Sequence, residues 1–207
     1  MITSIIFDLD GVLVDAKELH YIALNKALGK FGYTITRDEH ISTYDGLPTR
    51  TKMNILTEKK GLPVTLYDKI WMEKQLQTSK IVNTEYTYDE RIRSILKQLV
   101  KDGYKLSVCS NAIRVSVKMM LLRKGFLEYM EFYISNQDII LPKPNPEMYL
   151  RAMITLGVGP SNCIILEDSN YGRQAAVASG ATLCKIEDSS DVTLHKIRKS
   201  IREANDD

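Results

Sequence analysis

The stretch Ser4-Ile5-Ile6-Phe7-Asp8-Leu9-Asp10-Gly11 decides which fold we expect for this chain. A short apolar run followed directly by acidic residues and a glycine is typical of a buried strand that ends in a turn. Asp8 and Asp10 are two positions apart and project to the same side of an extended segment, so both can face one reacting group. Taken alone, this pattern is more often a plain strand end than a catalytic site.

Outward from this strand, four more apolar runs are typical of strands. They cover residues 104–109, 132–135, 163–166 and 181–186. Helical patterns lie between them, at about 90–102, 113–124, 145–156 and 170–179, and a basic helix follows the last strand. Strands that alternate with helices indicate a parallel sheet with helices on both faces. The sequence therefore predicts an α/β fold with a doubly wound parallel sheet.

Residues 15–85 do not follow this alternation. Their pattern is that of successive amphipathic helices, for example over 18–29, 49–60 and 65–76. We expect residues 1–14 and 86–207 to form an α/β core domain, and residues 15–85 to form an all-helical domain inserted after the first strand. This is the layout of a lid placed over a site.

The composition is that of a globular protein. Of the 207 residues, 44% are hydrophobic and 26% are charged, which excludes disordered and collagen-like chains. The formal charge is only +2, whereas nucleic-acid-binding domains usually carry a basic stripe. The longest uncharged run, 152–166, is too short and too polar to span a bilayer. We expect a monomer whose partners include neither nucleic acid nor a membrane.

The N-terminus and the cysteines favour a cytoplasmic location. Met1-Ile2-Thr3 leads directly into the first strand, without the charged segment and cleavage site of a secretion signal. The cysteines are odd in number, far apart and set in apolar runs, at Cys109, Cys163 and Cys184. This arrangement is typical of buried, reduced thiols, which suit a reducing compartment.

Polar side chains follow four of the predicted strands, at the edge of the sheet where ligands bind in doubly wound folds. They are Asp8 with Asp10, Ser110 with Asn111, Lys143, and Glu167 with Asp168. Four carboxylates so close together would repel one another unless a cation lay among them, and an all-oxygen set favours Mg²⁺. Phosphate commonly accompanies protein-bound Mg²⁺, and Lys143 supplies a compact positive charge that would hold it.

A pair of aspartates at this position suits phosphoryl transfer. A carboxylate nucleophile can attack phosphorus and form an aspartyl phosphate, while its neighbour protonates the leaving oxygen.

Competing motifs are absent from the sequence. A calcium loop that starts at Asp8 would need glycine at Leu13 and glutamate at Leu19, and Asn162 stands where a dinucleotide fingerprint needs its third glycine.

These residues resemble the motifs of the haloacid dehalogenase superfamily, in its β-phosphoglucomutase-like branch with a helical cap. The motifs stand here as Phe7-Asp8-Leu9-Asp10-Gly11-Val12, Ser110-Asn111, Lys143-Pro144-Asn145-Pro146 and Glu167-Asp168-Ser169. The resemblance covers Ile5 to about Ile186 and implies a Rossmann-like core with an inserted cap domain. Dehalogenases of the superfamily usually lack the second aspartate, so Asp10 indicates phosphoryl transfer.

The resemblance also implies a role for each residue of these motifs. Asp8 would be the nucleophile and a Mg²⁺ ligand, and Asp10 the general acid and base, whose backbone carbonyl also binds the metal. Asp168 would hold Mg²⁺, with Glu167 as a further ligand or as a carboxylate behind the ligands. Three residues would bind the transferring phosphoryl oxygens, namely Ser110, Asn111 through its backbone, and Lys143.

The cap carries weaker signals. The hinge Val14-Asp15-Ala16-Lys17-Glu18-Leu19-His20 keeps the Asp and His of the family's hinge but loses its Ser and Pro. His20 resembles a histidine that couples cap closure to proton transfer in sugar-phosphate mutases, and the alternative is an exposed helix residue without a catalytic role. Gly46 and Arg50 lie in a stretch that resembles the substrate-specificity loop, where Arg50 could grip a second anionic group. For Lys74, a solvated lysine is preferred over a cap cation.

Three functions fit these residues. The preferred one is a Mg²⁺-dependent phosphatase that hydrolyses a small phosphorylated metabolite, a sugar phosphate or a nucleotide, through an aspartyl-phosphate intermediate. The alternative is a sugar phosphomutase, in which a sugar hydroxyl replaces water as the acceptor. A non-catalytic phosphate-ligand-binding protein with the same fold is the third. Hydrolysis of phosphonoacetaldehyde would need a Schiff-base lysine in the cap, and Arg50 stands in the aligned region instead.

Overall fold

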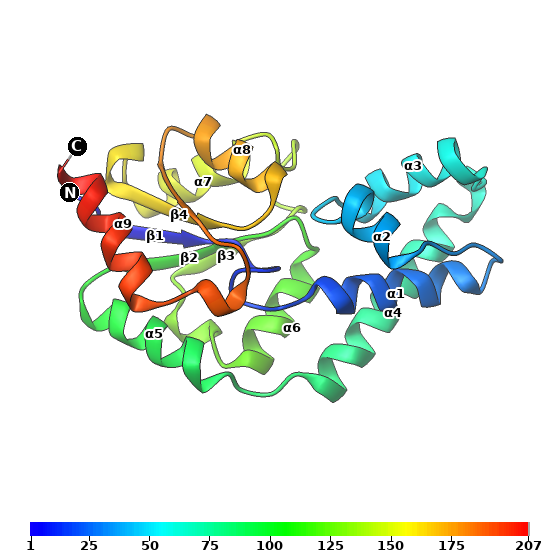
Figure 1. The fold of residues 1–207 in the computed structure, drawn as a ribbon, viewed down its shortest axis with the longest axis horizontal. Coiled ribbons are helices and arrows are strands. Elements are labelled where there is room, and N and C mark those ends of the chain that lie inside the picture. Colours follow the sequence, from blue (N-terminus) through cyan, green and yellow to red (C-terminus); the bar gives the residue numbers. More distant parts are fainter. Residues whose placement is uncertain (207) are drawn as a thin grey trace.

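The computed structural model describes residues 1–206. A parallel sheet of five strands, in the order β3-β2-β1-β4-β5, lies at its centre. The strands are β1 (Ser4–Phe7), β2 (Lys105–Cys109), β3 (Phe132–Ile134), β4 (Cys163–Glu167) and β5 (Thr182–Lys185). The predicted α/β fold with a doubly wound parallel sheet is confirmed (Figure 1).

The strand order explains where the polar residues of the motifs meet. β1 lies in the middle of the sheet, where Phe7 pairs with Val108 of β2 on one side and with Leu166 of β4 on the other. The three strands run in the same direction and end in nearly the same register. Residues that directly follow them therefore emerge at one edge of the sheet, where ligands bind in folds of this type.

Helices cover both faces of the sheet. One face packs against α5 (Glu90–Lys101), α6 (Arg114–Lys124) and α9 (Leu194–Asp206). The other face packs against α7 (Glu147–Leu156) and α8 (Asn170–Ala178). The helix expected over 145–156 begins only at Glu147 because prolines precede it at positions 144 and 146. Short 3₁₀ turns cover Leu127–Tyr129, Pro160–Asn162 and Ser189–Asp191.

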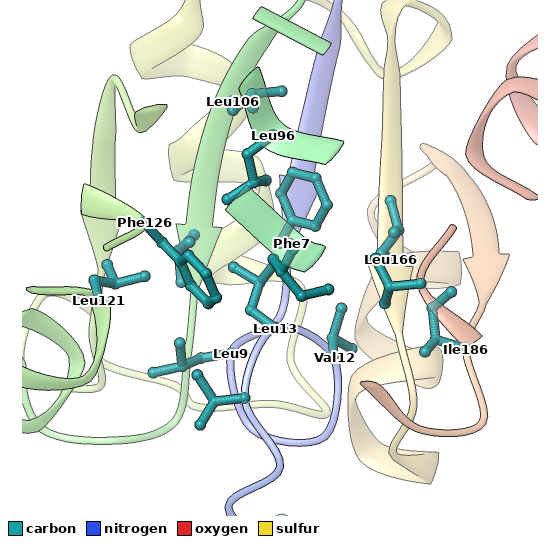
Figure 2. Packing of buried hydrophobic residues seen from close by; sticks show 14 of the residues in the cluster. Phe7, Leu9, Val12, Leu13, Leu96, Leu106, Leu121, Phe126, Leu166 and Ile186 are labelled. Atoms are coloured by element: carbon teal, nitrogen blue, oxygen red, sulfur yellow. The ribbon is translucent and has the colours of Figure 1, made fainter. Parts of the chain in front are cut away.

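β1 is buried on both faces, which is why its sequence is uniformly apolar. Ile5 and Phe7 point into the cluster beneath α5 and α6, whereas Ile6 points into the cluster beneath α7 and α8. Figure 2 shows the ring of Phe7 near Leu96 and Leu106. Burial of an aliphatic or aromatic side chain of this size contributes about 1.5–3 kcal/mol. This packing fixes the position at which Asp8 leaves the sheet.

Residues 17–85 are mainly helical. They form α1 (Lys17–Gly29), α2 (Arg37–Glu39) with a π-helical turn at His40–Tyr44, α3 (Thr49–Lys60), a 3₁₀ turn at Val64–Leu66, and α4 (Tyr67–Glu85). Their inward residues form an apolar cluster of their own, which includes Leu24, Tyr44, Met53, Leu56 and Ile70. Figure 1 shows these helices grouped beside the sheet. The division into domains at residues 14 and 85 stays a prediction.

Helix α4 is longer than the sequence pattern predicts, since it runs to Glu85 and not to about residue 76. Its first half packs into the cluster of the helical segment through Ile70. Its second half packs against the sheet's own cluster through Ile81 and Val82. The buried face of α4 therefore contacts one cluster in its first half and another in its second half. A prediction based on a single buried face ends the helix too early.

The cysteines and the helix lengths also bear on the sequence predictions. Cys109, Cys163 and Cys184 are buried free thiols, as predicted. Within residues 1–206, no helix combines the length and the apolar character needed to cross a bilayer.

Candidate active site

Lys143 joins two of the predicted site carboxylates at the edge of the sheet. Its Nζ lies 2.6 Å from Oδ1 of Asp8 and 2.5 Å from Oε1 of Glu167, and it also donates to the carbonyl oxygen of Cys109 at 2.9 Å. The side chain of Lys143 is only 3% exposed. The loop after β3 thus places the ammonium group of Lys143 between Asp8, which follows β1, and Glu167, which ends β4.

The charges at this edge do not balance. Burial raises the pKa of Asp8 well above its ordinary value, and repulsion from Glu167 adds to this effect despite the attraction of Lys143. Burial alone would lower the pKa of Lys143, but Asp8 and Glu167 outweigh it and raise that pKa. Burial also raises the pKa of Asp168 to about 6. The surplus of carboxylates over cations favours the arrival of a further positive charge.

The acidic cluster fits a divalent cation. Asp8, Glu167 and Asp168 each offer a carboxylate oxygen within 4.8 Å of the others. Oδ1 of Asp168 is buried and accepts no hydrogen bond from residues 1–206. Such an orphaned acceptor costs free energy unless a ligand meets it. An all-oxygen set of this kind suits a hard cation such as Mg²⁺.

Glu167 differs from the other two carboxylates because donors of the protein occupy both its oxygens. Oε1 accepts from Lys143 and from the hydroxyl of Tyr149, and Oε2 accepts from the backbone N–H and the hydroxyl of Ser169. The side chain is fully buried. These bonds favour the second of the two predicted roles for Glu167, that of a carboxylate behind the metal ligands, which orients Lys143.

Gly11 has a steric role beside this cluster. Its φ is +92°, and a Cβ atom at this position would lie 2.1 Å from Oδ2 of Asp168. Any side chain would therefore displace Asp168 in addition to straining the backbone. The glycine of the first motif makes room for the carboxylate that follows β4.

Ser110 and Asn111, which follow β2, lie at the same edge. Ser110 is buried, and its hydroxyl accepts from the N–H of Ala112 at 3.0 Å. The side chain of Asn111 accepts from the N–H of Lys143 at 3.2 Å and donates to the carbonyl of Gly46 at 3.2 Å. Asn111 therefore links the loop that carries Lys143 to the helical segment through its side chain, a contact that the sequence did not predict.

His20, on α1, reaches the second aspartate of the first motif. Its Nε2 lies 3.1 Å from Oδ2 of Asp10, and its side chain is 12% exposed. The interpretation of His20 as an exposed helix residue is therefore wrong. Burial lowers the pKa of His20, helped by Lys74 and opposed by Asp10. Burial would raise the pKa of Asp10, but the contact with His20 outweighs it and the pKa is lowered.

The structure corrects the expectation for Lys74. This residue of α4 is 7% exposed and lines the same cavity, so it is not a solvated lysine. The guanidinium of Arg50 lies at the exposed rim, where it pairs with Asp68 at 2.9 Å. Gly46 borders the cavity and approaches Ser169 of the core.

Two lysines of the site were missed in the sequence. Lys17 at the start of α1 places its Nζ 3.1 Å from Oδ2 of Asp168. Lys52 on α3 is 4% exposed and faces the cavity. A signal for Lys52 existed, because it shares the buried face of α3 with Thr49, Met53 and Leu56 at helical spacing. Nothing in the sequence distinguishes Lys17 from a solvated lysine.

These groups border one cavity between the sheet edge and the helical segment. Its volume is about 120 Å³, room for about four water molecules at their liquid density. The core contributes Asp8, Asp10, Ser110, Asn111, Lys143 and Asp168, and the helical segment contributes His20, Gly46, Arg50, Lys52 and Lys74. The predicted site residues thus meet around a space suited to a small ligand, with Glu167 beneath it.

Comparisons with known proteins agree with this geometry. A pyrophosphatase, PpaX, from Bacillus velezensis is 29% identical over 180 residues, which cover 86% of this chain and 80% of that protein. A phosphorylated carbohydrates phosphatase from Thermotoga maritima is 26% identical over 86% of this chain and 81% of its own length. Both relatives are phosphatases by name.

Solved structures share the fold. A β-phosphoglucomutase from Clostridium difficile superposes with a TM-score of 0.86 and 22% identity over the whole of both chains. CbbY from Rhodobacter sphaeroides, solved in complex with phosphate, gives a TM-score of 0.81 and 22% identity, with 89% of this chain and 86% of that chain covered. A sequence model described as haloacid dehalogenase-like hydrolase matches residues 5–186. The predicted resemblance is confirmed, and this chain is an enzyme that belongs to the haloacid dehalogenase-like hydrolase family.

Proposed function

We propose that the enzyme is a Mg²⁺-dependent phosphatase that hydrolyses a small phosphorylated metabolite through an aspartyl phosphate formed on Asp8. One observation carries the proposal. Asp8, held by Lys143, and Asp10, held by His20, border the same cavity from positions two apart in the chain. A nucleophile and a proton donor with separate partners can act on the two ends of one P–O bond.

In the first step, a carboxylate oxygen of Asp8 bonds to phosphorus while the bond from phosphorus to the leaving oxygen breaks. The anionic substrate beside Asp10 favours the protonated form of this carboxyl, against the lowered pKa of the free protein. Asp10 gives this proton to the leaving oxygen, so the product leaves protonated. Lys143, together with Ser110 and the backbone of Asn111, neutralises the charge on the transferring phosphoryl oxygens. Phosphoryl transfer depends mainly on such positioning and neutralisation.

In the second step, water attacks the phosphorus of the aspartyl phosphate and the bond to Asp8 breaks. Asp10, now ionised, takes the proton from this water, and inorganic phosphate forms. Asp10 thus returns to its protonated state and Asp8 to its carboxylate. His20 contacts Asp10 at 3.1 Å and is the neighbour that can share this proton.

Asp8 and Asp168 are the side chains that would hold Mg²⁺, with the backbone carbonyl of Asp10, while Glu167 holds Lys143. When bound, the ion supplies positive charge that offsets the phosphoryl oxygens and the clustered carboxylates. The orphaned Oδ1 of Asp168 and the raised pKa of Asp8 support this assignment.

We propose that residues 15–85 form a cap over a core made of residues 1–14 and 86–207. Its first helix contacts the core through His20 with Asp10 and through Lys17 with Asp168. Closure of a cap of this kind excludes bulk water from the reacting groups and admits a single attacking molecule.

The test is phosphate release from a panel of sugar phosphates, nucleotides, phosphoglycolate and pyrophosphate in Mg²⁺, with Asp8→Asn and Asp10→Asn as the variants. Asp8→Asn should stay folded and lose nearly all activity, because an amide lacks the nucleophilic carboxylate that forms the aspartyl phosphate. Asp10→Asn should also lose most activity, because it can neither protonate the leaving oxygen nor accept the proton of the attacking water. Full activity of Asp8→Asn would overturn the proposed intermediate.

The contact of His20 with Asp10 favours one second candidate, a sugar phosphomutase, because His20 resembles the histidine that couples cap closure to proton transfer in sugar-phosphate mutases. The two candidates differ in the acceptor and share Asp8 as nucleophile. Conversion of β-glucose 1-phosphate to glucose 6-phosphate, primed by a bisphosphate, would identify the mutase. Release of free phosphate from the same compound would identify the phosphatase.

A further inference from the structure

Lys52 of α3 and Lys74 of α4 are buried, face the active-site cavity and lack a partner. The two residues are 4% and 7% exposed. Neither ammonium group makes a hydrogen bond or an ion pair with any residue from Met1 to Asp206. Both side chains nevertheless line the cavity. Two adjacent helices therefore direct into the site positive charge that Asp10 and Asp45 attract but that no carboxylate of residues 1–206 pairs with directly.

This arrangement is unfavourable in the free protein. Burial, with repulsion from Lys74, lowers the pKa of Lys52 to about 7, and burial lowers the pKa of Lys74 to about 8. A buried charge without a partner costs free energy that packing alone does not recover. Strongly perturbed groups in a cleft are typical of sites that meet a ligand, and here the missing partner is an anion.

The other cations around the cavity already have carboxylate partners. Lys143 pairs with Asp8 and Glu167, Lys17 pairs with Asp168, and Arg50 pairs with Asp68. Among the lysines and arginines that line the cavity in residues 1–206, Lys52 and Lys74 alone remain available. A ligand that supplies one anion for Lys143 would leave these two lysines without a counter-charge.

The two lysines lie on the leaving-group side of the proposed reaction. Both come from the helical segment, as does His20, the residue that contacts Asp10, and all three line the cavity, where Asp10 attracts both lysines. Lys143, in contrast, lies against Asp8. Since Asp10 would protonate the leaving oxygen, a group held by Lys52 and Lys74 belongs to the part of the substrate that departs.

We propose that Lys52 and Lys74 bind a second anionic group on the substrate, so that the enzyme acts on small phosphoryl compounds whose leaving group is itself a carboxylate or a phosphate anion. The inference rests on the proposed phosphatase function and narrows it. It assigns recognition of the leaving group to buried lysines of the helical segment. Arg50, the residue first expected to hold a second anion, remains with Asp68 at the rim.

The test compares matched substrates. 2-Phosphoglycolate carries a carboxylate, pyrophosphate carries a second phosphate, and ethyl phosphate has a leaving group of similar size without charge. Wild-type kcat/KM should be about 10- to 100-fold higher for one of the doubly anionic compounds than for ethyl phosphate, the range that a charged hydrogen bond provides. Which compound is preferred tells whether the second anion is a carboxylate or a phosphate.

Lys52→Met and Lys74→Met are the variants. Each should raise KM about 10-fold or more for the preferred compound, and the loss in kcat/KM should be clearly larger for that compound than for ethyl phosphate. Lys59→Met on α3 and Lys80→Met on α4 are matched controls, because both lysines are exposed. Equal wild-type activity on all three compounds would overturn the inference. So would equal losses on charged and uncharged substrates in the lysine variants.

A binding measurement separates this inference from the phosphatase proposal. Trp71, the only tryptophan, lines the cavity, so its fluorescence can report ligand binding. In Asp8→Asn protein, 2-phosphoglycolate or pyrophosphate should bind about 10-fold more weakly once Lys52 or Lys74 is replaced by methionine. Absent hydrolysis with lysine-dependent binding would contradict only the phosphatase function. Hydrolysis with lysine-independent binding would contradict only the second-anion site.

Discussion

The hydroxyl of Tyr149 donates a hydrogen bond to Oε1 of Glu167 at 2.6 Å, and both side chains are fully buried. The same oxygen accepts from Lys143, whose Nζ lies 4.7 Å from the centroid of the Tyr149 ring. A residue of α7 thus helps to hold the lysine that contacts Asp8. The groups facing the cavity depend on a second layer of buried polar groups beneath them.

Replacement of Tyr149 by phenylalanine should destabilise the protein. The variant keeps the ring and removes one donor from a buried carboxylate, which costs about 1–3 kcal/mol in the free energy of unfolding. Urea denaturation measures this change. Tyr44→Phe is the matched control, because the buried hydroxyl of Tyr44 has no hydrogen-bond partner in residues 1–206. A loss of stability in the control as large as in Tyr149→Phe would refute the explanation.

Replacement of Gly172 by alanine should disrupt Glu167. A Cβ atom at this position of α8 would lie 1.9 Å from Oε1 of Glu167, a carboxylate that its hydrogen bonds hold in place. We expect a loss of activity and about 1–3 kcal/mol of destabilisation, because the carboxylate must leave its donors. Gly29→Ala, where a Cβ meets nothing within 4 Å, should instead be neutral or slightly stabilising. Phosphate release and thermal melting of both variants provide the comparison.

Mg²⁺ should stabilise the folded protein before any substrate is added. An ion that binds only the folded state adds about 2.7 kcal/mol at a concentration one hundred times its dissociation constant. Thermal melting in EDTA and in excess Mg²⁺ should therefore differ by several degrees. Asp168→Asn should abolish this shift, and Glu58→Gln, at an exposed position of α3, should retain it. An undiminished shift in Asp168→Asn would place the ion elsewhere.

His40 should make stability depend on pH. Burial lowers its pKa from 6.5 to about 4, and the residue is 1% exposed. The unfolded chain therefore binds a proton below pH 6.5 that the folded protein refuses until about pH 4, so stability falls as the pH drops through this window. The loss from this group between pH 7 and pH 5 is about 2 kcal/mol. In His40→Gln, chemical denaturation at the two pH values should show a pH-dependent loss smaller by that amount.

The sequence alone determined the sheet and the edge at which its polar residues meet. Each short apolar run ends in polar residues, and parallel strands bring their carboxyl ends to one edge. The contact of Lys143 with Asp8 therefore follows from strand order, although the two residues are 135 positions apart. Gly11 was also predictable as part of a turn. The sequence did not show that any side chain at this position would clash with Asp168.

Only the tertiary structure decided what the helical segment contributes. A helical pattern gives the face on which a side chain lies, but it does not give what that face opposes. Helical spacing puts Lys52 on the buried face of α3, but Lys52 and Lys74 reach the active site only because α3 and α4 turn those faces toward the cavity. Arg50, two positions before Lys52, points instead to Asp68 at the surface. Charge placement in this segment depends on how the helices pack together, and local sequence carries no record of that packing.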